Sequence, residues 1–259
     1  MLSVAGLLHL DAGEINILGR GPFDAGIHSG RISILPQDSL LPQNCSVSSM
    51  LYRFARMQGL DDSAARKSCA ALLKAVGLEN RGGSTVASLS HGMRMRCLIA
   101  QCFIGNPELV ILDEPLNGLD SVQARRIRNF IKSRTGKQTI VISSHNLHDL
   151  EELCTHVAFV ESGRVVKNAA MNSITRASSV INYVLSGAPS DLSDLEMLLP
   201  QAQLAWSDGS KTLTCTMENS AMDAAEINKI LLPHLIDRYG VVAVTPGQSL
   251  EEAYFAAIG

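Results

Sequence analysis

The chain has 259 residues, of which 46% are hydrophobic and 18% charged, and its formal net charge at pH 7 is −3. These values are typical of a globular protein with a sizeable core. The net charge gives no support for a nucleic-acid-binding surface, where a basic face would be expected. No apolar run reaches the roughly 18–20 residues of a membrane-spanning helix, and the N-terminus lacks the basic start of a signal peptide. The length predicts one large domain and one small one.

The cysteines are spread along the chain without any C-x-x-C pair. This spacing argues against a zinc site or a disulfide framework. We therefore expect unpaired, buried thiols in a reducing compartment. The cysteines are Cys45, Cys69, Cys97, Cys102, Cys154 and Cys215.

In the first third of the chain, short strands precede a helical region. Alternating apolar and polar residues around Gly and Pro predict strands over Glu14–Leu18 and Arg31–Leu35. Helical spacing of Ala, Leu, Met and Arg then predicts helices over residues 47–59 and 62–76, which end at Gly77.

From Ser90 onward, helices and strands alternate. Ser90 is a suitable N-cap for a helix from Met93 to about Gly105. The elements predicted after it are strand 109–112, helix 121–134, strand 139–143, helix 146–154 and strand 157–161. Such alternation predicts a parallel, doubly wound sheet whose ligands bind beyond the carboxyl ends of the strands.

After Ser162-Gly163-Arg164 the pattern changes to that of a smaller α+β unit. An Asp208-Gly209 pair between two apolar runs is typical of a β-hairpin. The predicted order is strand Ile181–Leu185, helix Leu192–Leu199, hairpin strands Gln203–Trp206 and Lys211–Met217, helix Ala221–Tyr239 and strand Val241–Val244. This βαββαβ order favours a small ferredoxin-like domain.

Two carboxylates, Asp113 and Glu114, follow the apolar strand Leu109–Leu112 directly, and Pro115 closes the strand. One carboxylate at such a strand end can hold Mg²⁺ while the next polarises a water, as a Mg²⁺-nucleotide site requires. The alternative is a pair of solvent-exposed carboxylates with no ligand.

Three further motifs surround this pair in a characteristic order. Leu89–Arg94 (LSHGMR) lies about twenty residues before it, Leu116–Asp120 (LNGLD) follows at once, and Ser143-Ser144-His145 ends the next apolar strand. Together the four motifs resemble the nucleotide-binding subunit of an ABC transporter. The resemblance implies an α/β fold of the P-loop NTPase (RecA-like) type, with a parallel sheet and a helical subdomain, and it implies ATP and Mg²⁺ as ligands.

The resemblance also implies roles for the residues on their own nucleotide. Asp113 corresponds to the Walker B aspartate that holds Mg²⁺ through water, and Glu114 to the catalytic carboxylate that orients or deprotonates the attacking water. His145 corresponds to the switch histidine that hydrogen-bonds the γ-phosphate. His148, three residues on, could form a metal pair with His145, but a surface histidine on a helix is favoured because no third ligand is evident.

Other residues correspond to positions that serve a dimer. Ser90, His91 and Gly92 resemble the signature motif, which binds the γ-phosphate of ATP held by the opposite subunit, although His91 and Met93 depart from the common Gly and Gln. The alternative there is a capped helix without a ligand. Asp120 resembles the aspartate that couples the two nucleotide sites, and it would also cap the next helix.

A glutamine that binds Mg²⁺ and water is the remaining family position. Gln37, which follows a predicted strand directly after Pro36, resembles it best. Gln43 is also preceded by a proline and is the competing choice. We prefer Gln37 because it lies at the carboxyl end of a strand.

The phosphate loop G-x-x-x-x-G-K-[ST], whose amides and lysine cradle the phosphates, does not occur in the sequence; Gly19 and Gly21 have no Gly-Lys-Ser/Thr after them. Met1–Leu8 resembles the helix that follows this loop in the family, and Asp11–Ile15 the turn and strand after it. We therefore expect the chain to begin a few residues past the loop, without the adenine-stacking aromatic residue, and to be inactive as it stands.

The family organisation implies domains and partners. An ATPase domain would span residues 1–165, with its helical subdomain at about 45–105, and an accessory domain residues 175–259. The partners would be a membrane permease, docked on the helical insert at the cytoplasmic face, and a second ABC subunit in a homodimer or heterodimer. The tail Ser249–Phe255 resembles that of the drug- and antibiotic-exporting branch, which implies export.

Two other functions are possible for a member of the same superfamily. A non-catalytic partner subunit would contribute only its signature motif, Ser90 and its helix, to another subunit's ATP. The intact Gln37, Asp113, Glu114 and His145 argue against it, because they serve a site on their own chain. A DNA-repair or translation-factor member is disfavoured because the chain has neither a long coiled-coil insertion nor a second cassette.

Overall fold

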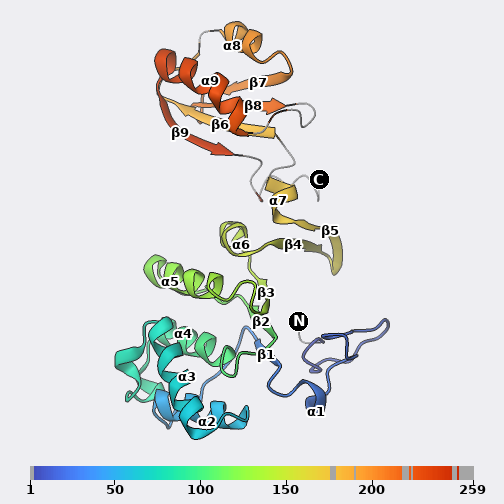
Figure 1. The fold of residues 1–259 in the computed structure, drawn as a ribbon, viewed down its shortest axis with the longest axis vertical. Helices are drawn as coiled ribbons and strands as arrows, with labels where there is room; N and C mark the ends of the chain where they lie inside the picture. The colour runs from blue at the N-terminus through green and yellow to red at the C-terminus, as the bar shows by residue number, and fades with distance from the viewer. Residues whose placement is uncertain are drawn as a thin grey trace. The chain divides into compact units, whose positions relative to one another are not determined.

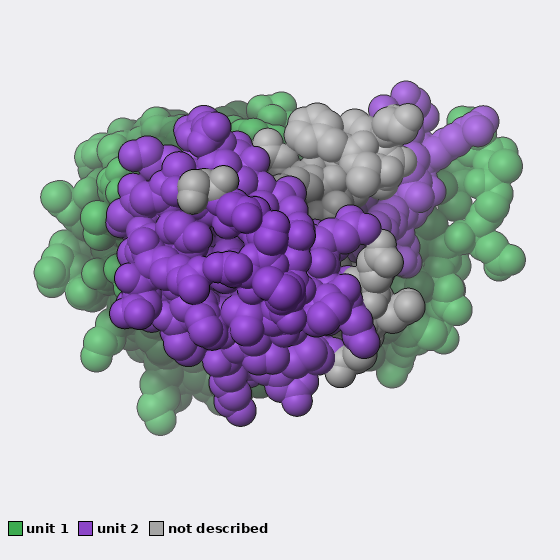
Figure 2. All heavy atoms as spheres, turned by 90° about the horizontal axis from the view of Figure 1, so that it is seen from above, with its two compact units in different colours: residues 1–153 green, residues 154–259 purple. Residues whose placement is uncertain are grey.

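The computed structural model describes residues 3–175, 179–189, 191–217, 222, 224–246 and 250. The chain divides into two compact units, residues 1–153 (unit 1) and residues 154–259 (unit 2), which Figure 2 shows in green and purple. No helix within the described ranges is both long and apolar enough to cross a membrane.

Unit 1 contains a three-stranded parallel sheet (Figure 1). Its strands are β1 (Ile32–Leu35), β2 (Leu109–Asp113) and β3 (Thr139–Ser143), in the order β1-β2-β3. The first four residues of β2 are buried, as its unbroken apolar run predicts for a central parallel strand. Because the strands are parallel, Leu35, Asp113 and Ser143 end at the same edge of the sheet.

Three helices form most of the core of unit 1. They are α2 (Val47–Met57), α3 (Asp62–Ala75) and α4 (His91–Cys102), and their N-caps are Ser46, Asp61 and Ser90. Each cap side chain accepts a hydrogen bond from a backbone N–H of the first turn, which satisfies one orphan donor of the helix. All three predicted helices, and the cap at Ser90, are confirmed.

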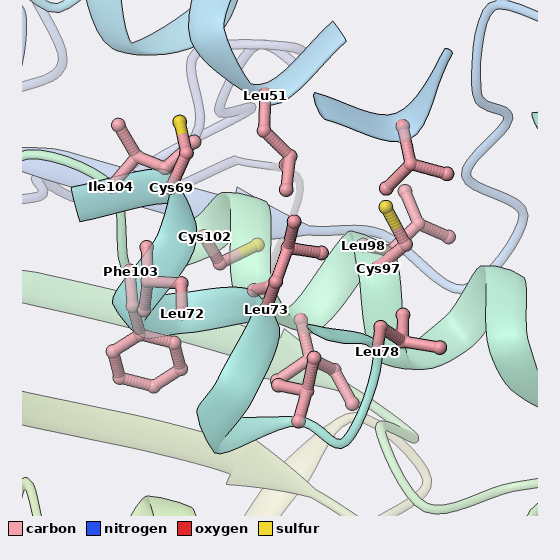
Figure 3. Packing of buried hydrophobic residues seen from close by; sticks show 14 of the residues in the cluster. Leu51, Cys69, Leu72, Leu73, Leu78, Cys97, Leu98, Cys102, Phe103 and Ile104 are labelled. Atoms are coloured by element: carbon pink, nitrogen blue, oxygen red, sulfur yellow. The ribbon is translucent and has the colours of Figure 1, made fainter. Parts of the chain in front are cut away.

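Figure 3 shows how α3 and α4 meet beneath α2, with Leu72 and Leu73 facing the cluster that includes Cys97 and Cys102. The Phe103 ring packs edge-on against Phe130, with 4.8 Å between ring centroids. Burial raises the pKa of the Cys97 and Cys102 thiols to about 12, so both stay protonated and unreactive at neutral pH. All six cysteines are free; four are buried, as predicted, while Cys45 and Cys154 are half-buried.

Two helices of unit 1 are joined by an ion-pair network. They are α5 (Ser121–Lys132) and α6 (Leu147–Leu153). Arg128 Nη1 donates to Asp149 Oδ1 at 2.6 Å, and Arg128 Nε lies 2.8 Å from Glu152 Oε2. Lys132 donates to the other Glu152 oxygen at 2.8 Å and holds the pKa of that carboxyl below its ordinary value.

The expected elements at the N-terminus are wrong. Residues 3–8 form turns instead of a helix, and residues 14–18 form no strand. The chain turns back where the Ile17 N–H donates to Gly21 O at 2.8 Å, with Leu18 at φ +53°. Glycines 6, 13, 19 and 21 all have positive φ, and this conformation interrupts both helix and strand. The first helix is therefore the short α1 (Ala25–His28).

The strand predicted at 157–161 exists but belongs to a different sheet. In unit 2, β4 (His156–Glu161) pairs antiparallel with β5 (Arg164–Ala170), which α7 (Met171–Thr175) follows. Ser162 and Gly163 have φ of +48° and +77°. Two successive residues with positive φ make the tight turn that matches hairpin twist, so β4 pairs with β5 and not with the parallel sheet.

The rest of unit 2 follows the predicted order. The elements are β6 (Ser179–Leu185), α8 (Ser193–Leu198), β7 (Ala202–Ser207), β8 (Thr212–Met217), α9 (Ala224–Tyr239) and β9 (Val241–Pro246). The four strands are antiparallel in the order β7-β8-β6-β9. The hairpin turn contains Asp208-Gly209, but its left-handed residue is Lys211. The tail 249–255 lies outside the described residues except for Leu250.

Alternate side chains of this sheet pack against its helices. Leu213 and Cys215 of β8 share one buried cluster with Leu231 and Leu235 of α9. Tyr183 of β6 is fully buried in the same cluster, and its hydroxyl donates to Asn228 Oδ1 at 2.8 Å. This single helix-covered face gives unit 2 its own core.

Candidate functional site

The candidate site lies at the carboxyl ends of β2 and β3. Asp113 is paired in register with Ser143 on the neighbouring strand, and the Ser143 hydroxyl donates to Asp113 Oδ1. The Glu114 N–H donates to both Ser143 Oγ (3.1 Å) and Ser143 O (3.2 Å). Ser143 therefore ties the first carboxylate to the backbone of the second.

Glu114 and His145, the predicted catalytic pair, are in direct contact. Glu114 Oε1 accepts a hydrogen bond from the His145 N–H at 2.9 Å, and His145 Nδ1 lies 2.9 Å from the same oxygen. The Glu114 side chain is 18% exposed and that of His145 is 76% exposed. The Glu114 carboxylate is therefore mostly buried, whereas the His145 ring is largely exposed to solvent.

The backbone at Glu114 is left-handed, with φ +48°. A non-glycine residue in this region stores strain of about 1–3 kcal/mol and is most common at functional sites. Here the strain is offset by the two hydrogen bonds that the Glu114 N–H donates to Ser143 and by the buried strand β2 before it. The turn aims Glu114 toward His145 instead of continuing the strand.

The donor set suits a metal ion that is held jointly with a nucleotide better than one held by protein side chains alone. Within the described part of the chain no group of three or more His, Cys, Asp or Glu side chains could hold a metal ion. Mg²⁺ in nucleotide sites is commonly held by one or two carboxylates, with phosphate oxygens and waters completing its shell. Asp113, half-buried beside the Ser143 hydroxyl, fits that arrangement. His148 is exposed on α6.

The predicted signature residues begin α4. Ser90 is exposed, and its hydroxyl accepts from the Met93 N–H at 3.3 Å. The body of α4 is anchored by Arg96, which is only 6% exposed and donates through Nη1 to Val76 O (2.8 Å) and Gly77 O (3.0 Å). A rigid helix therefore presents its N-terminus, and its positive end of the dipole, at the surface.

The signature residues contact the turn after Glu114 in their own chain. A Cβ on Gly118 would lie 2.8 Å from the His91 ring, and a Cβ on Gly92 would lie 3.0 Å from Gln123 Oε1. Asp120 caps α5, because its carboxylate accepts from the Gln123 N–H at 2.8 Å and also from the Gln123 side-chain amide. The structure thus brings His91, Gly92 and Asp120 together.

Gln37 stands apart from these contacts. It is exposed, two residues beyond the end of β1 and so at the same sheet edge as Asp113. Its side chain has no hydrogen-bonding partner among the described residues. The competing Gln43 lies nearer α2, where its backbone O accepts from the Ala87 N–H at 3.3 Å.

Sequence reasoning missed the bridging role of Ser143. The signal was available, because two neighbouring parallel strands of equal length bring their last residues side by side. It also missed Gln123 and Arg96. Nothing in the local pattern distinguishes them from other polar residues on a helix surface.

Comparisons with known proteins show the family to which the chain belongs. The family model described as "ABC transporter" matches residues 1–117. The chain is 31% identical over 220 residues to the Nod factor export ATP-binding protein I of Burkholderia pseudomallei (strain 1710b), covering 83% of this chain and 71% of that protein. It is 36% identical over 138 residues to the protein of the same name from Cupriavidus pinatubonensis, covering 52% and 42%.

A solved structure described as "Structure of ATP binding subunit of ABC transporter" also resembles the fold. Its TM-score is 0.60 at 25% sequence identity, and the match covers 68% of this chain and 74% of that one.

Proposed function

Because this chain belongs to the ABC transporter family of ATP-binding subunits, we propose that it uses ATP to power export through a separate membrane permease. The observation that carries the proposal is the cluster of Asp113, Glu114, Ser143 and His145 at one edge of a parallel sheet. Export, in place of import, is supported by the relatives, which are named for export of Nod factors.

Each residue of the cluster has a proposed role on ATP. Asp113, with Gln37, would hold Mg²⁺, which when bound neutralises phosphate charge and orients the γ-phosphate. Glu114 accepts a proton from the attacking water. His145 donates a hydrogen bond to the γ-phosphate from its exposed ring.

The contact between Glu114 and His145 leaves one carboxylate oxygen for the water. Oε1 is occupied by the His145 N–H and faces its Nδ1. Oε2 has no partner among the described residues, and we assign it to the attacking water. With Nδ1 protonated and donating to Oε1, the exposed Nε2 can only accept; donation to a phosphate therefore needs a doubly protonated ring or release of the Nδ1 contact.

Ser90, His91 and Gly92 would act on the ATP of a second subunit. The Ser90 hydroxyl and the N-terminal dipole of α4 favour an anion at the exposed end of the helix. A dimer, of identical or different ABC subunits, is therefore part of the proposal, and Asp120 would couple its two sites. Docking on the permease would bring the chain to the cytoplasmic face of the membrane.

We also propose the domain assignment. The ATPase domain spans residues 1–165, with a helical subdomain at about 45–105 that contains α2, α3 and α4. The accessory domain spans residues 175–259 and is ferredoxin-like. Its βαββαβ order and its sheet order β7-β8-β6-β9 support the second assignment.

A non-catalytic partner subunit is the second candidate function. The exposed start of α4 favours it, because Ser90 and the positive end of the helix dipole can serve another subunit's ATP without a nucleotide on this chain. The Glu114–His145 contact favours the catalytic candidate, because a subunit that lends only its signature motif has no use for it.

Titration of the 259-residue chain with MgATP is expected to give no better than millimolar affinity. Several charge-assisted hydrogen bonds of about 1.5–3 kcal/mol each are missing without a phosphate loop. Isothermal calorimetry measures the affinity, with a loop-bearing relative titrated in parallel as the control. Micromolar binding would reveal a phosphate site of another kind and would contradict this expectation.

Co-purification tests the transport function itself. The chain, fused behind a phosphate loop, should bind membranes that contain the permease encoded beside it and should stay soluble without that permease. The contact would use the helical insert around residues 47–76, where Met57 is 78% exposed. A protein that hydrolyses ATP but never associates with those membranes would rule out the transporter function.

A further inference from the structure

We propose that His91 is a positioning residue that locks the N-terminus of α4 to the turn of residues 114–120 in the same chain. Through this lock, a ligand or partner that moves Ser90 would also move the turn that begins at Glu114 and ends at Asp120. The inference rests on the proposed function of Ser90 and Glu114 for its meaning, although the contact itself stands on geometry alone.

The central contact is between the His91 ring and the backbone of Gly118. A Cβ on Gly118 would lie 2.8 Å from both Cδ2 and Nε2 of His91, closer than real carbon contacts allow. The ring therefore lies directly over the Gly118 α-carbon. Gly118 also has φ +74°, so a glycine is required twice at this position, once for the backbone and once for the ring.

A second contact lies one residue further along α4. A Cβ on Gly92 would be 3.0 Å from Gln123 Oε1 and 3.4 Å from Leu119 Cδ2. Gln123 is in turn held by the Asp120 carboxylate. The first turn of α4 thus packs against both the middle of the 114–120 turn and the start of α5.

Backbone hydrogen bonds make the 114–120 turn a stiff link. The Asn117 N–H donates to Glu114 O and the Leu119 N–H to Leu116 O, both at 3.2 Å. Glu114 is itself fixed by Ser143. These bonds tie the residues on both sides of Gly118 to Glu114 and Leu116. A displacement of Gly118 should therefore also move the Glu114 carbonyl.

His91 contributes little to the hydrophobic core, so its contact with Gly118 can be removed without disturbing core packing. The residue is exposed, and α4 is anchored independently by Arg96 and by its buried face. A glycine or alanine at position 91 would have no atoms that reach Gly118. Loss of the ring should therefore loosen the turn without unfolding unit 1.

Hydrogen exchange and NMR on the 259-residue chain, without nucleotide, test the proposal. His91→Ala should speed exchange of the Asn117 and Leu119 amides by about fivefold or more, because the turn that contains them loses its contact with the His91 ring. It should also shift the ring signal of His145, which contacts Glu114, while amides in the body of α4 stay unchanged. His91→Phe should restore slow exchange, since it returns a ring over Gly118.

His234→Ala removes an exposed histidine of α9 in unit 2 and is the matched control, expected to change neither readout. Unchanged exchange at Asn117 and Leu119 in His91→Ala would overturn the lock, and so would an unchanged His145 signal. Because no nucleotide is present, these outcomes are independent of whether Glu114 hydrolyses ATP. A positive result here with no ATPase defect on changing Glu114 would leave the contact standing and remove its proposed purpose.

Discussion

Glu114→Gln, in a chimera with a phosphate loop fused ahead of this chain, is expected to bind ATP normally but to lower kcat by about 10²- to 10⁴-fold. The range is the usual contribution of a general base. Glutamine keeps the size and one acceptor oxygen of glutamate, so Asp113 and the Ser143 bonds to the backbone of residue 114 remain. The amide cannot take the proton of the attacking water.

Single-turnover hydrolysis and nucleotide binding, measured on the same preparation, separate the two effects. Glu79→Gln is the matched control, because Glu79 is exposed in a short 3-10 turn away from β2. The control should retain full activity. Hydrolysis by Glu114→Gln at the rate of the parent chimera would show that another group accepts the proton.

Asp149→Asn is expected to destabilise unit 1 by about 2–4 kcal/mol. The Asp149 side chain is 9% exposed and the Arg128 side chain 17% exposed, with 2.6 Å between Nη1 and Oδ1. Breaking a buried pair leaves the remaining charge undercompensated. Glu152 still faces Arg128, which keeps the loss below that of a fully isolated charge.

Denaturant unfolding followed by two probes measures this loss. Trp206 is the single tryptophan and lies in unit 2, so its fluorescence follows that unit, while circular dichroism follows both. Asp62→Asn is the control, because Asp62 and Arg66 form an exposed pair on α3, with side chains 60% and 70% exposed, and water screens such a pair. Equal midpoints for Asp149→Asn and the parent would contradict the prediction.

Local physical chemistry was enough to predict most elements. Ser46, Asp61 and Ser90 each cap a helix that begins at the next residue, since a short polar side chain competes well for orphan amides. The unbroken apolar run of β2 predicted a buried central strand. The order of the elements from β6 to β9 in unit 2 also follows from residue patterns alone.

The N-terminal segment shows where such reasoning ends. Met1–Leu8 has the composition of a helix and Glu14–Leu18 that of a strand, yet the described part of this segment forms turns. A strand needs a neighbour to satisfy its backbone groups, and a short helix needs a surface to pack on. Leu7 and Leu8 are 65% and 56% exposed and have no such surface.

The sequence by itself determined the family and which side chains to examine, because the order Gln37, Ser90, Asp113, Glu114, Asp120, His145 is a property of the chain. Only the tertiary structure decided which of them touch. Parallel pairing of β2 with β3 brings Ser143 to Asp113, the left-handed Glu114 turns its carboxylate to His145, and packing of α4 lays His91 over Gly118. The last two contacts depend on backbone conformation and helix placement, which residue spacing does not encode.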